Sequence, residues 1–129
     1  MNFLLWDVPV VAPHPRALEL LSFEYKVSQL CLKVAEEDSG RVWSATFQSV
    51  QAFKVVTWEC GAHLLSSAPD GGFFEIAAPS QWLEELGLGE QNFLKKSRHF
   101  VVCTYDDIVH VVAWSCIFVL EETVAVGPT

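Results

Sequence analysis

The sequence predicts a single α+β domain over residues 1–129, in which a bent antiparallel sheet of five to seven strands carries one principal helix. Two patterns support this fold class. Residues 98–120 contain two runs of β-branched and aromatic residues that meet at Asp106-Asp107, which is typical of an antiparallel hairpin. Residues 79–87 contain the strongest helix pattern in the chain. The hairpin runs are largely apolar on both faces, so we expect them near the centre of the sheet.

The segment before residue 42 predicts edge and hairpin strands. Asn2 to Val11 is apolar and is followed by a pair of prolines, so we expect an edge strand or an extended arm. From Phe23 the apolar residues alternate, and their parity changes across Ser28-Gln29, which indicates a bulge or a tight turn. Residues 36–40 are acidic, end in glycine and predict a turn.

The middle of the chain predicts further strands and a loop. Residues 42–58 are β-rich but are interrupted at Ser49-Val50-Gln51, which predicts two strands or one kinked strand. Residues 59–72 are rich in turn formers and predict an exposed loop. Residues 73–76 predict a short strand.

The helix pattern has recognisable ends. Pro79 or Ser80 can start the helix and Gly87 can stop it. Its apolar side chains would then lie on one face and pack on the sheet, and these are Trp82, Leu83 and Leu86. Residues 89–96 predict a second helical turn before the hairpin.

The net charge is −8, from sixteen acidic and eight basic side chains. A negative field repels phosphate backbones, so no nucleic-acid partner is expected. The charge favours a basic protein partner or simple solubility. Hydrophobic residues make up 51% of the chain, with five tryptophans and nine phenylalanines, which predicts a packed core and favours a homodimer.

The cysteines and the first residues indicate a cytoplasmic protein. The four cysteines form no Cys-x-x-Cys pair, so we expect reduced thiols and no zinc site. Residues 1–7 lack the basic region and cleavage pattern of a secretory signal. The longest uncharged run, 108–120, is shorter than the roughly 20 residues that span a bilayer, so no membrane association is expected.

Three residues of the hairpin are candidates for catalysis or metal binding. A turn at Asp106-Asp107 places Cys103 opposite His110, with His99 on the same face, and a histidine can activate a thiolate. The same three side chains are also a candidate set of metal ligands. They lie mid-strand in an apolar setting without a third orienting group, so we expect core residues and predict no catalytic residue, cofactor or metal.

Acidic residues gather at the predicted turns. Solvated turns are their ordinary explanation, and the alternative is a surface complementary to a cationic protein. None of these groups has the alternating spacing of a calcium loop. The predicted protein-binding residues are Glu36, Glu37, Asp38, Asp106 and Asp107.

A longer pattern connects these elements. A Phe-x-x-Val-x-x-Phe phrase precedes a Ser-x-Trp helix, and a His-aromatic strand then leads through an acidic turn into an apolar strand. The matching residues are Phe47, Val50, Phe53, Ser80, Trp82, His99, Phe100, Tyr105, Asp106, Asp107, Val109 and Val111. Over residues 43–114 this pattern resembles small uncharacterised bacterial proteins of the immunity-protein type. The resemblance implies a non-enzymatic α+β binding protein whose acidic surface occludes the cationic active site of a toxin.

We therefore expect a small acidic, cytoplasmic, non-enzymatic binding protein, with neutralisation of a toxin as its specific form. The first alternative is a carrier of an apolar small ligand inside a curled sheet. Its cavity would be lined by Trp43, Phe47, Trp82 and Trp114. The second alternative is a hydrolase-like enzyme that uses Cys103 and His110.

Overall fold

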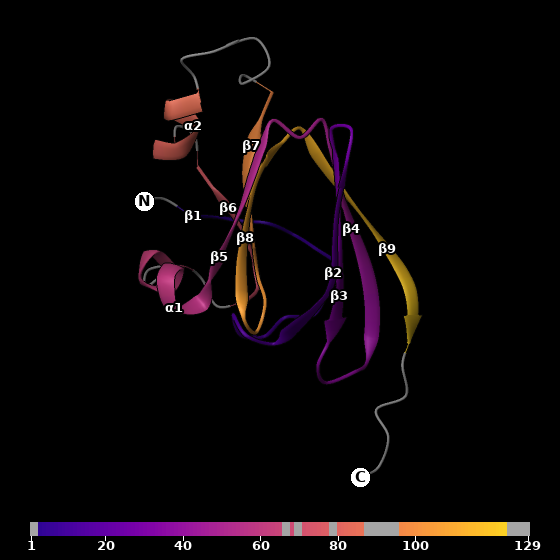
Figure 1. The fold of residues 1–129 in the computed structure, drawn as a ribbon. Coiled ribbons are helices and arrows are strands. Elements are labelled where there is room, and N and C mark those ends of the chain that lie inside the picture. The colour runs from indigo at the N-terminus through magenta and orange to yellow at the C-terminus, as the bar shows by residue number, and fades with distance from the viewer. Residues whose placement is uncertain (1–2, 66–67, 69–70, 78–79, 87–95, 124–129) are drawn as a thin grey trace.

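The computed structural model describes residues 3–65, 68, 71–77, 80–86 and 96–123, which form two antiparallel β-sheets that face each other (Figure 1). The five-stranded sheet has the order β1 (Phe3–Leu5), β6 (Phe73–Ile76), β7 (Arg98–Cys103), β8 (Asp107–Ala113) and β5 (Ala52–Thr57). The four-stranded sheet has the order β2 (Leu18–Lys26), β3 (Gln29–Glu36), β4 (Arg41–Gln48) and β9 (Ser115–Thr123).

Short helical segments lie on the outer side of the five-stranded sheet, away from the other sheet (Figure 1). They are α1 (Trp58–Gly61), the 3-10 helix η1 (Ala62–Leu65) and α2 (Gln81–Leu86). The α+β fold class with one principal helix is therefore wrong, because the described part of the chain is mostly strand and forms a β-sandwich. Alternation of apolar residues shows that a strand has one buried face, but not which sheet the strand joins. The pattern therefore suggested one bent sheet where two are present.

The main core lies between the two sheets. Alternate residues of both sheets point into it, and its buried members include Leu32, Phe47, Phe100 and Val111. Trp6, which follows β1, packs against this core from one side. Its ring centroid lies 4.7 Å from that of Phe100, 5.5 Å from those of Phe73 and Phe118, and 6.1 Å from that of Phe47.

A long two-stranded ribbon joins the sheets. β4 pairs with β9 in one sheet, and their continuations β5 and β8 pair in the other. The pairing carries across the bend, where Gln51 N donates to Val112 O (2.8 Å) and Trp114 N donates to Gln48 O (3.1 Å). Ser49 has a φ of 53°, in the left-handed region that a sharp change of direction requires. The predicted interruption at Ser49-Val50-Gln51 is confirmed as a boundary between two strands.

The hairpin of β7 and β8 lies inside the five-stranded sheet and is almost entirely buried, as predicted. Its predicted register is wrong, because Cys103 pairs with Ile108 and His110 pairs with Val101. The cause is Thr104, whose N–H and hydroxyl both donate to Asp107 O while Asp107 N donates to Thr104 Oγ. These bonds close the turn around Tyr105-Asp106, one residue earlier than the acidic pair suggested.

Other local predictions can be compared with the structure. The tight turn near Ser28 is confirmed, with positive φ at Val27 and Ser28. The edge strand near the N-terminus and the short strand at 73–76 are confirmed as β1 and β6. The loop predicted from residue 59 is wrong for residues 59–65, which form helical turns. Glu59, Cys60 and His63 are exposed as expected, but Gly61 and Leu65 are buried. The predicted helix ends Pro79 and Gly87 lie outside the described residues, as do residues 89–95.

Across the described ranges, no helix is both long enough and apolar enough to span a membrane.

Replacing Trp6 by alanine should lower the free energy of unfolding by about 3 kcal/mol, because a large aromatic would leave a gap among four phenylalanines. Denaturant unfolding of W6A and wild type measures this change. The matched control is Leu5→Ala, since Leu5 is 83% exposed and its truncation should cost less than about 0.5 kcal/mol. Equal losses in the two variants would contradict the assignment of Trp6 to the core.

Candidate functional site

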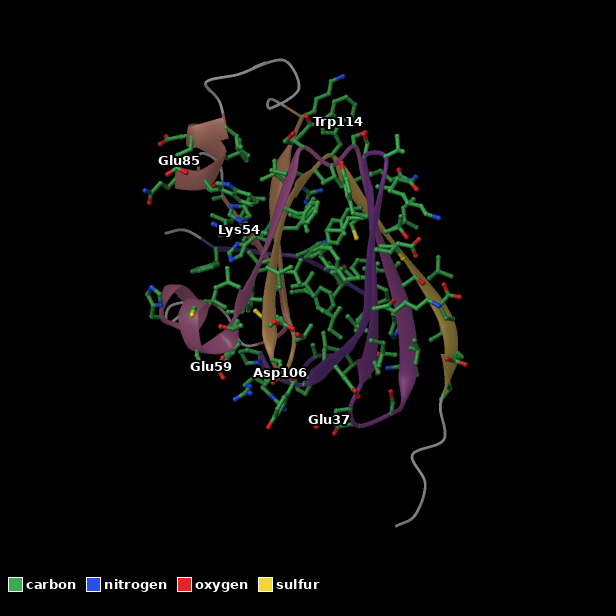
Figure 2. The ribbon with its side chains drawn as sticks, in the orientation of Figure 1. Glu37, Lys54, Glu59, Glu85, Asp106 and Trp114 are labelled. Carbon is green, nitrogen blue, oxygen red and sulfur yellow. The ribbon has the colours of Figure 1, made fainter. Side chains whose placement is uncertain are left out.

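Two surface pockets bring together polar residues from distant parts of the sequence. The first, which we call the acidic end, is a pocket of about 240 Å³ lined by Leu18, Glu19, Glu37, Tyr105 and Asp106. Glu37 lies in the β3–β4 turn and Asp106 in the β7–β8 turn, at the same end of the sandwich (Figure 2). Glu19 comes from the start of β2. Three carboxylates that are far apart in sequence therefore surround one pocket.

Backbone hydrogen bonds fix both turns of the acidic end on the first residue of β2 and the residue before it. Tyr105 N donates to Leu18 O at 2.7 Å, and Glu37 N donates to Ala17 O at 3.2 Å. Arg16 holds the aromatic wall, because its Nε donates to Tyr105 O (2.8 Å) and its guanidinium lies over the Tyr105 ring, 4.2 Å from the centroid. The pocket is thus supported by the fold and not by a free loop.

The carboxylates of the acidic end form no ion pair with any of the described residues. Glu19, Glu37 and Asp106 take part in none of the ion pairs found there, and no basic residue lines the pocket. The nearby Arg16 is engaged with Tyr105 and with the Trp58 ring, 5.4 Å from its centroid. The pocket therefore concentrates negative charge beside a half-exposed tyrosine.

Glu36, one of the five predicted binding residues, is a structural residue. It is only 3% exposed, and its carboxylate accepts hydrogen bonds from Ser39 Oγ (2.6 Å), Arg41 Nη2 (2.7 Å), Trp43 Nε1 (2.7 Å) and Val11 N (3.1 Å). Burial alone would raise the pKa of Glu36, but these hydrogen bonds outweigh it and hold the pKa below its ordinary value. Its carboxylate is therefore committed to the fold.

The other four predicted residues divide into two pairs. Glu37 and Asp106 come together at the acidic end, whereas Asp38 is exposed in the β3–β4 turn and Asp107 is half-buried as the first residue of β8. Sequence reasoning missed Glu19 and Tyr105. No local pattern marks them, since they reach the pocket only because both turns dock on β2.

The second pocket, which we call the histidine pocket, has a volume of about 250 Å³ and lies on the outer face of the five-stranded sheet. Its polar floor is a pair of buried imidazoles, with His99 Nε2 2.9 Å from His110 Nδ1. His99 Nδ1 lies 3.0 Å from Ser80 Oγ, which in turn accepts a hydrogen bond from Leu83 N as the N-cap of α2. Trp82 packs edge-on against His99 at a centroid distance of 5.2 Å.

Both imidazoles are neutral at pH 7. Burial lowers the pKa of His99 to about 3, helped by the neighbouring His110 and Lys54. Burial and the charge of Lys54 lower the pKa of His110 to about 4. The pair is therefore a hydrogen-bonded neutral unit.

Cys103 does not join the histidines. It is fully buried among apolar side chains of the outer face, including Leu65, Phe74 and Ile108. Burial raises the pKa of its thiol to about 12, so the reactive thiolate is absent at neutral pH. Cys103 and His110 are not paired in the register, since Cys103 lies opposite Ile108. The described residues contain no cluster of three or more His, Cys, Asp or Glu suited to a metal ion.

The aromatic residues proposed for a carrier do not line one cavity. Trp43 and Phe47 belong to the filled core between the sheets. Trp82 lies on the opposite face of the five-stranded sheet, and Trp114 lies at the bend of the ribbon beneath Lys96, whose Nζ is 5.0 Å from its ring centroid. The curled-sheet cavity therefore has no counterpart in the described structure.

Comparison with known proteins adds no family: no protein-family model, no curated protein and no solved structure matches this chain.

The role of Glu36 can be tested by its pH dependence. Glu36→Gln should lower the free energy of unfolding at pH 7 by about 2 kcal/mol, because charged hydrogen bonds are lost in a buried site. The folded-state pKa lies below the unfolded value, roughly 4.3. The contribution is therefore full above that pH and is lost as the pH falls through the folded-state pKa. Urea unfolding at pH 7 and pH 3 should show the variant and wild type converging at low pH. The exposed neighbour serves as control, and an equal loss in Glu37→Gln would contradict the assignment.

The neutral histidine pair can be tested by NMR. Imidazole nitrogen shifts of His99 and His110 should remain those of neutral rings at pH 5, because their pKa values lie at about 3 and about 4. Since the unfolded value is roughly 6.5, both groups should also make the fold less stable as the pH falls from there toward 4. Imidazolium signals from either ring in the folded protein at pH 5 would contradict this.

Proposed function

We propose that this chain is a small acidic binding protein, not an enzyme, whose acidic end receives a lysine or arginine side chain of a protein partner. The observation that carries the proposal is the convergence of Glu19, Glu37 and Asp106 on one pocket beside the Tyr105 ring.

The chemistry of this pocket suits a cation with an apolar stem. Carboxylates pair with ammonium or guanidinium groups, and the Tyr105 ring already attracts one such cation, the guanidinium of Arg16. Tyr105 is 52% exposed, so its ring is accessible from solvent. Because both turns are already fixed on β2, binding would not require the pocket to be ordered first.

The charge of the whole chain supports the same kind of partner. A net charge of −8 accelerates encounter with a basic protein and makes binding sensitive to salt. A bacterial toxin with a cationic active site is the specific partner that we propose, in line with the resemblance to immunity-type proteins. Occlusion of that active site requires only binding.

Location and self-association are further parts of the proposal. All four cysteines are free thiols, which fits a reducing cytoplasm. β9 is an edge strand of the four-stranded sheet and exposes Ile117, Val119 and Leu120, each close to half of its surface. An apolar edge of this kind supports a homodimer through β9.

The proposal is tested with a fluorescent arginine-glycine peptide as probe. The double variant Glu37→Gln/Asp106→Asn should weaken binding roughly tenfold or more, since each lost charge contact is worth about 1 kcal/mol at 4 Å in water. Fluorescence anisotropy at low and high salt measures the dissociation constants.

The matched control is Glu24→Gln/Glu122→Gln, which changes the net charge equally at two exposed sites away from the pocket. It should weaken binding less than about threefold. An equal loss in both double variants would mean that the net charge alone binds the probe, and the proposed site would be rejected.

A further inference from the structure

The histidine pocket lies apart from the acidic end and shares no lining residue with it. Its wall comes from β5, η1, β6 and α2, and its floor from β7 and β8. The lining residues are Lys54, Leu65, Ile76, Ser80, Gln81, Trp82, Glu85, His99 and His110. Lys54 on β5 and Glu85 on α2 lie on the same outer side of the five-stranded sheet (Figure 2).

Hydrogen-bond balance fixes the tautomers of the two histidines. Ser80 Oγ accepts the N–H of Leu83, and its own proton can then be donated to His99 Nδ1. His99 must in that case carry its proton on Nε2 and donate it to His110 Nδ1. The reverse direction would leave the buried Ser80 hydroxyl proton without an acceptor among the described residues. The chain of bonds therefore runs from Ser80 to His110.

The end of this chain is a donor that faces the pocket. With Nδ1 of His110 acting as an acceptor, its Nε2 carries the proton, and no described residue accepts it. His110 is only 6% exposed, but no buried side-chain nitrogen or oxygen of the described residues lacks a hydrogen-bond partner, so this donor is open to the water of the pocket. A bound group that accepts this hydrogen bond would take the place of that water, whereas a group without an acceptor would leave the donor unpaired.

A cation lies beside that donor. Lys54 is the direct cross-strand neighbour of His110, and its Nζ lies over the Trp82 ring, 4.6 Å from the centroid. Two donors, one neutral and one positively charged, therefore approach the same space. The rest of the lining includes the apolar side chains of Leu65 and Ile76 and the ring of Trp82.

These features select one class of ligand. A metal ion is disfavoured by a nitrogen that already carries a proton. A wholly apolar molecule would leave the His110 donor unpaired, and a dianion such as phosphate would meet one lysine and the opposing charge of Glu85. From this geometry we infer that the histidine pocket binds a small organic monocarboxylate, with its carboxylate on His110 Nε2 and Lys54 and its apolar body on Trp82, Leu65 and Ile76.

The inference is tested with benzoate and its neutral counterpart benzamide. Titration calorimetry should show benzoate binding the full-length protein at least tenfold more tightly than benzamide. Lys54→Met keeps the aliphatic stem and should weaken benzoate binding at least tenfold. Lys33→Met makes the same change at an exposed position on β3, in the other sheet, and should leave binding unchanged.

A second measurement reports on the donor itself. Benzoate should shift the Nε2 and Nε2–H signals of His110 in long-range ¹H–¹⁵N spectra, and it should do so in the Glu37→Gln/Asp106→Asn variant as well, since the acidic end is not involved. Equal binding of benzoate and benzamide, an equal effect of the two lysine variants, or an unchanged His110 signal would overturn the inference. The absence of binding at benzoate concentrations up to about 10 mM would also overturn the inference, because a minimal site has a dissociation constant in the millimolar range. That result would mean that the pocket holds only water.

Discussion

The structure depends on a single backbone constraint, the bend of the ribbon that passes from one sheet to the other. A strand that changes sheets must keep its apolar side chains pointing into the same interior, so its period of two has to be broken at the bend. In the arm formed by β4 and β5, core residues are spaced by three and not by two: Phe47, Val50 and Phe53 all contribute to the core. In the other arm the break is the three-residue step from Ala113 to Cys116. The first step is visible in the sequence as an interruption of the alternation, whereas the second lies in a run that is apolar on both faces and shows no such interruption.

This constraint explains which parts of the fold the sequence could predict. The buried runs of β7 and β8 and the interruption near Val50 are local patterns, and both are confirmed. The second run of the hairpin was predicted to reach residue 120, however, and it leaves this sheet after Ala113. The second sheet could not be read from any single segment, because its existence depends on pairing between strands as distant as β4 and β9. The turn of the central hairpin lies one residue earlier than the two aspartates indicate, because Thr104 closes it, and the partner of Cys103 therefore shifts by two residues, from His110 to Ile108.

The acidic residues show the same division between local and long-range information. Glu36 continues the inward parity of Leu30, Leu32 and Val34, so the alternation of β3 already contained the signal that it is buried. Glu37, next in sequence, is turned outward by the same alternation. Glu19 and Tyr105 carry no such signal, because their positions at the acidic end require two turns to dock on the first residues of β2. Composition predicted an acidic surface, and topology concentrates part of it at one end.

The histidines follow from how the outer face of the five-stranded sheet is covered. α1 and η1 lie over one part of this face and α2 over another (Figure 1). These segments have only four to six residues each, so they cannot cover it continuously.

Beneath η1 the face is apolar, with Cys103, Phe74 and Ile108 around Leu65. Where the pocket opens between η1 and α2, apolar strand residues would be exposed to water, and His99 and His110 occupy these positions instead. An imidazole pair tied to the N-cap of α2 tolerates partial hydration, and it anchors the helix that forms the wall of the pocket. His99 and His110 therefore hold α2 in place on the sheet and leave a hydrogen-bond donor in the pocket between η1 and α2.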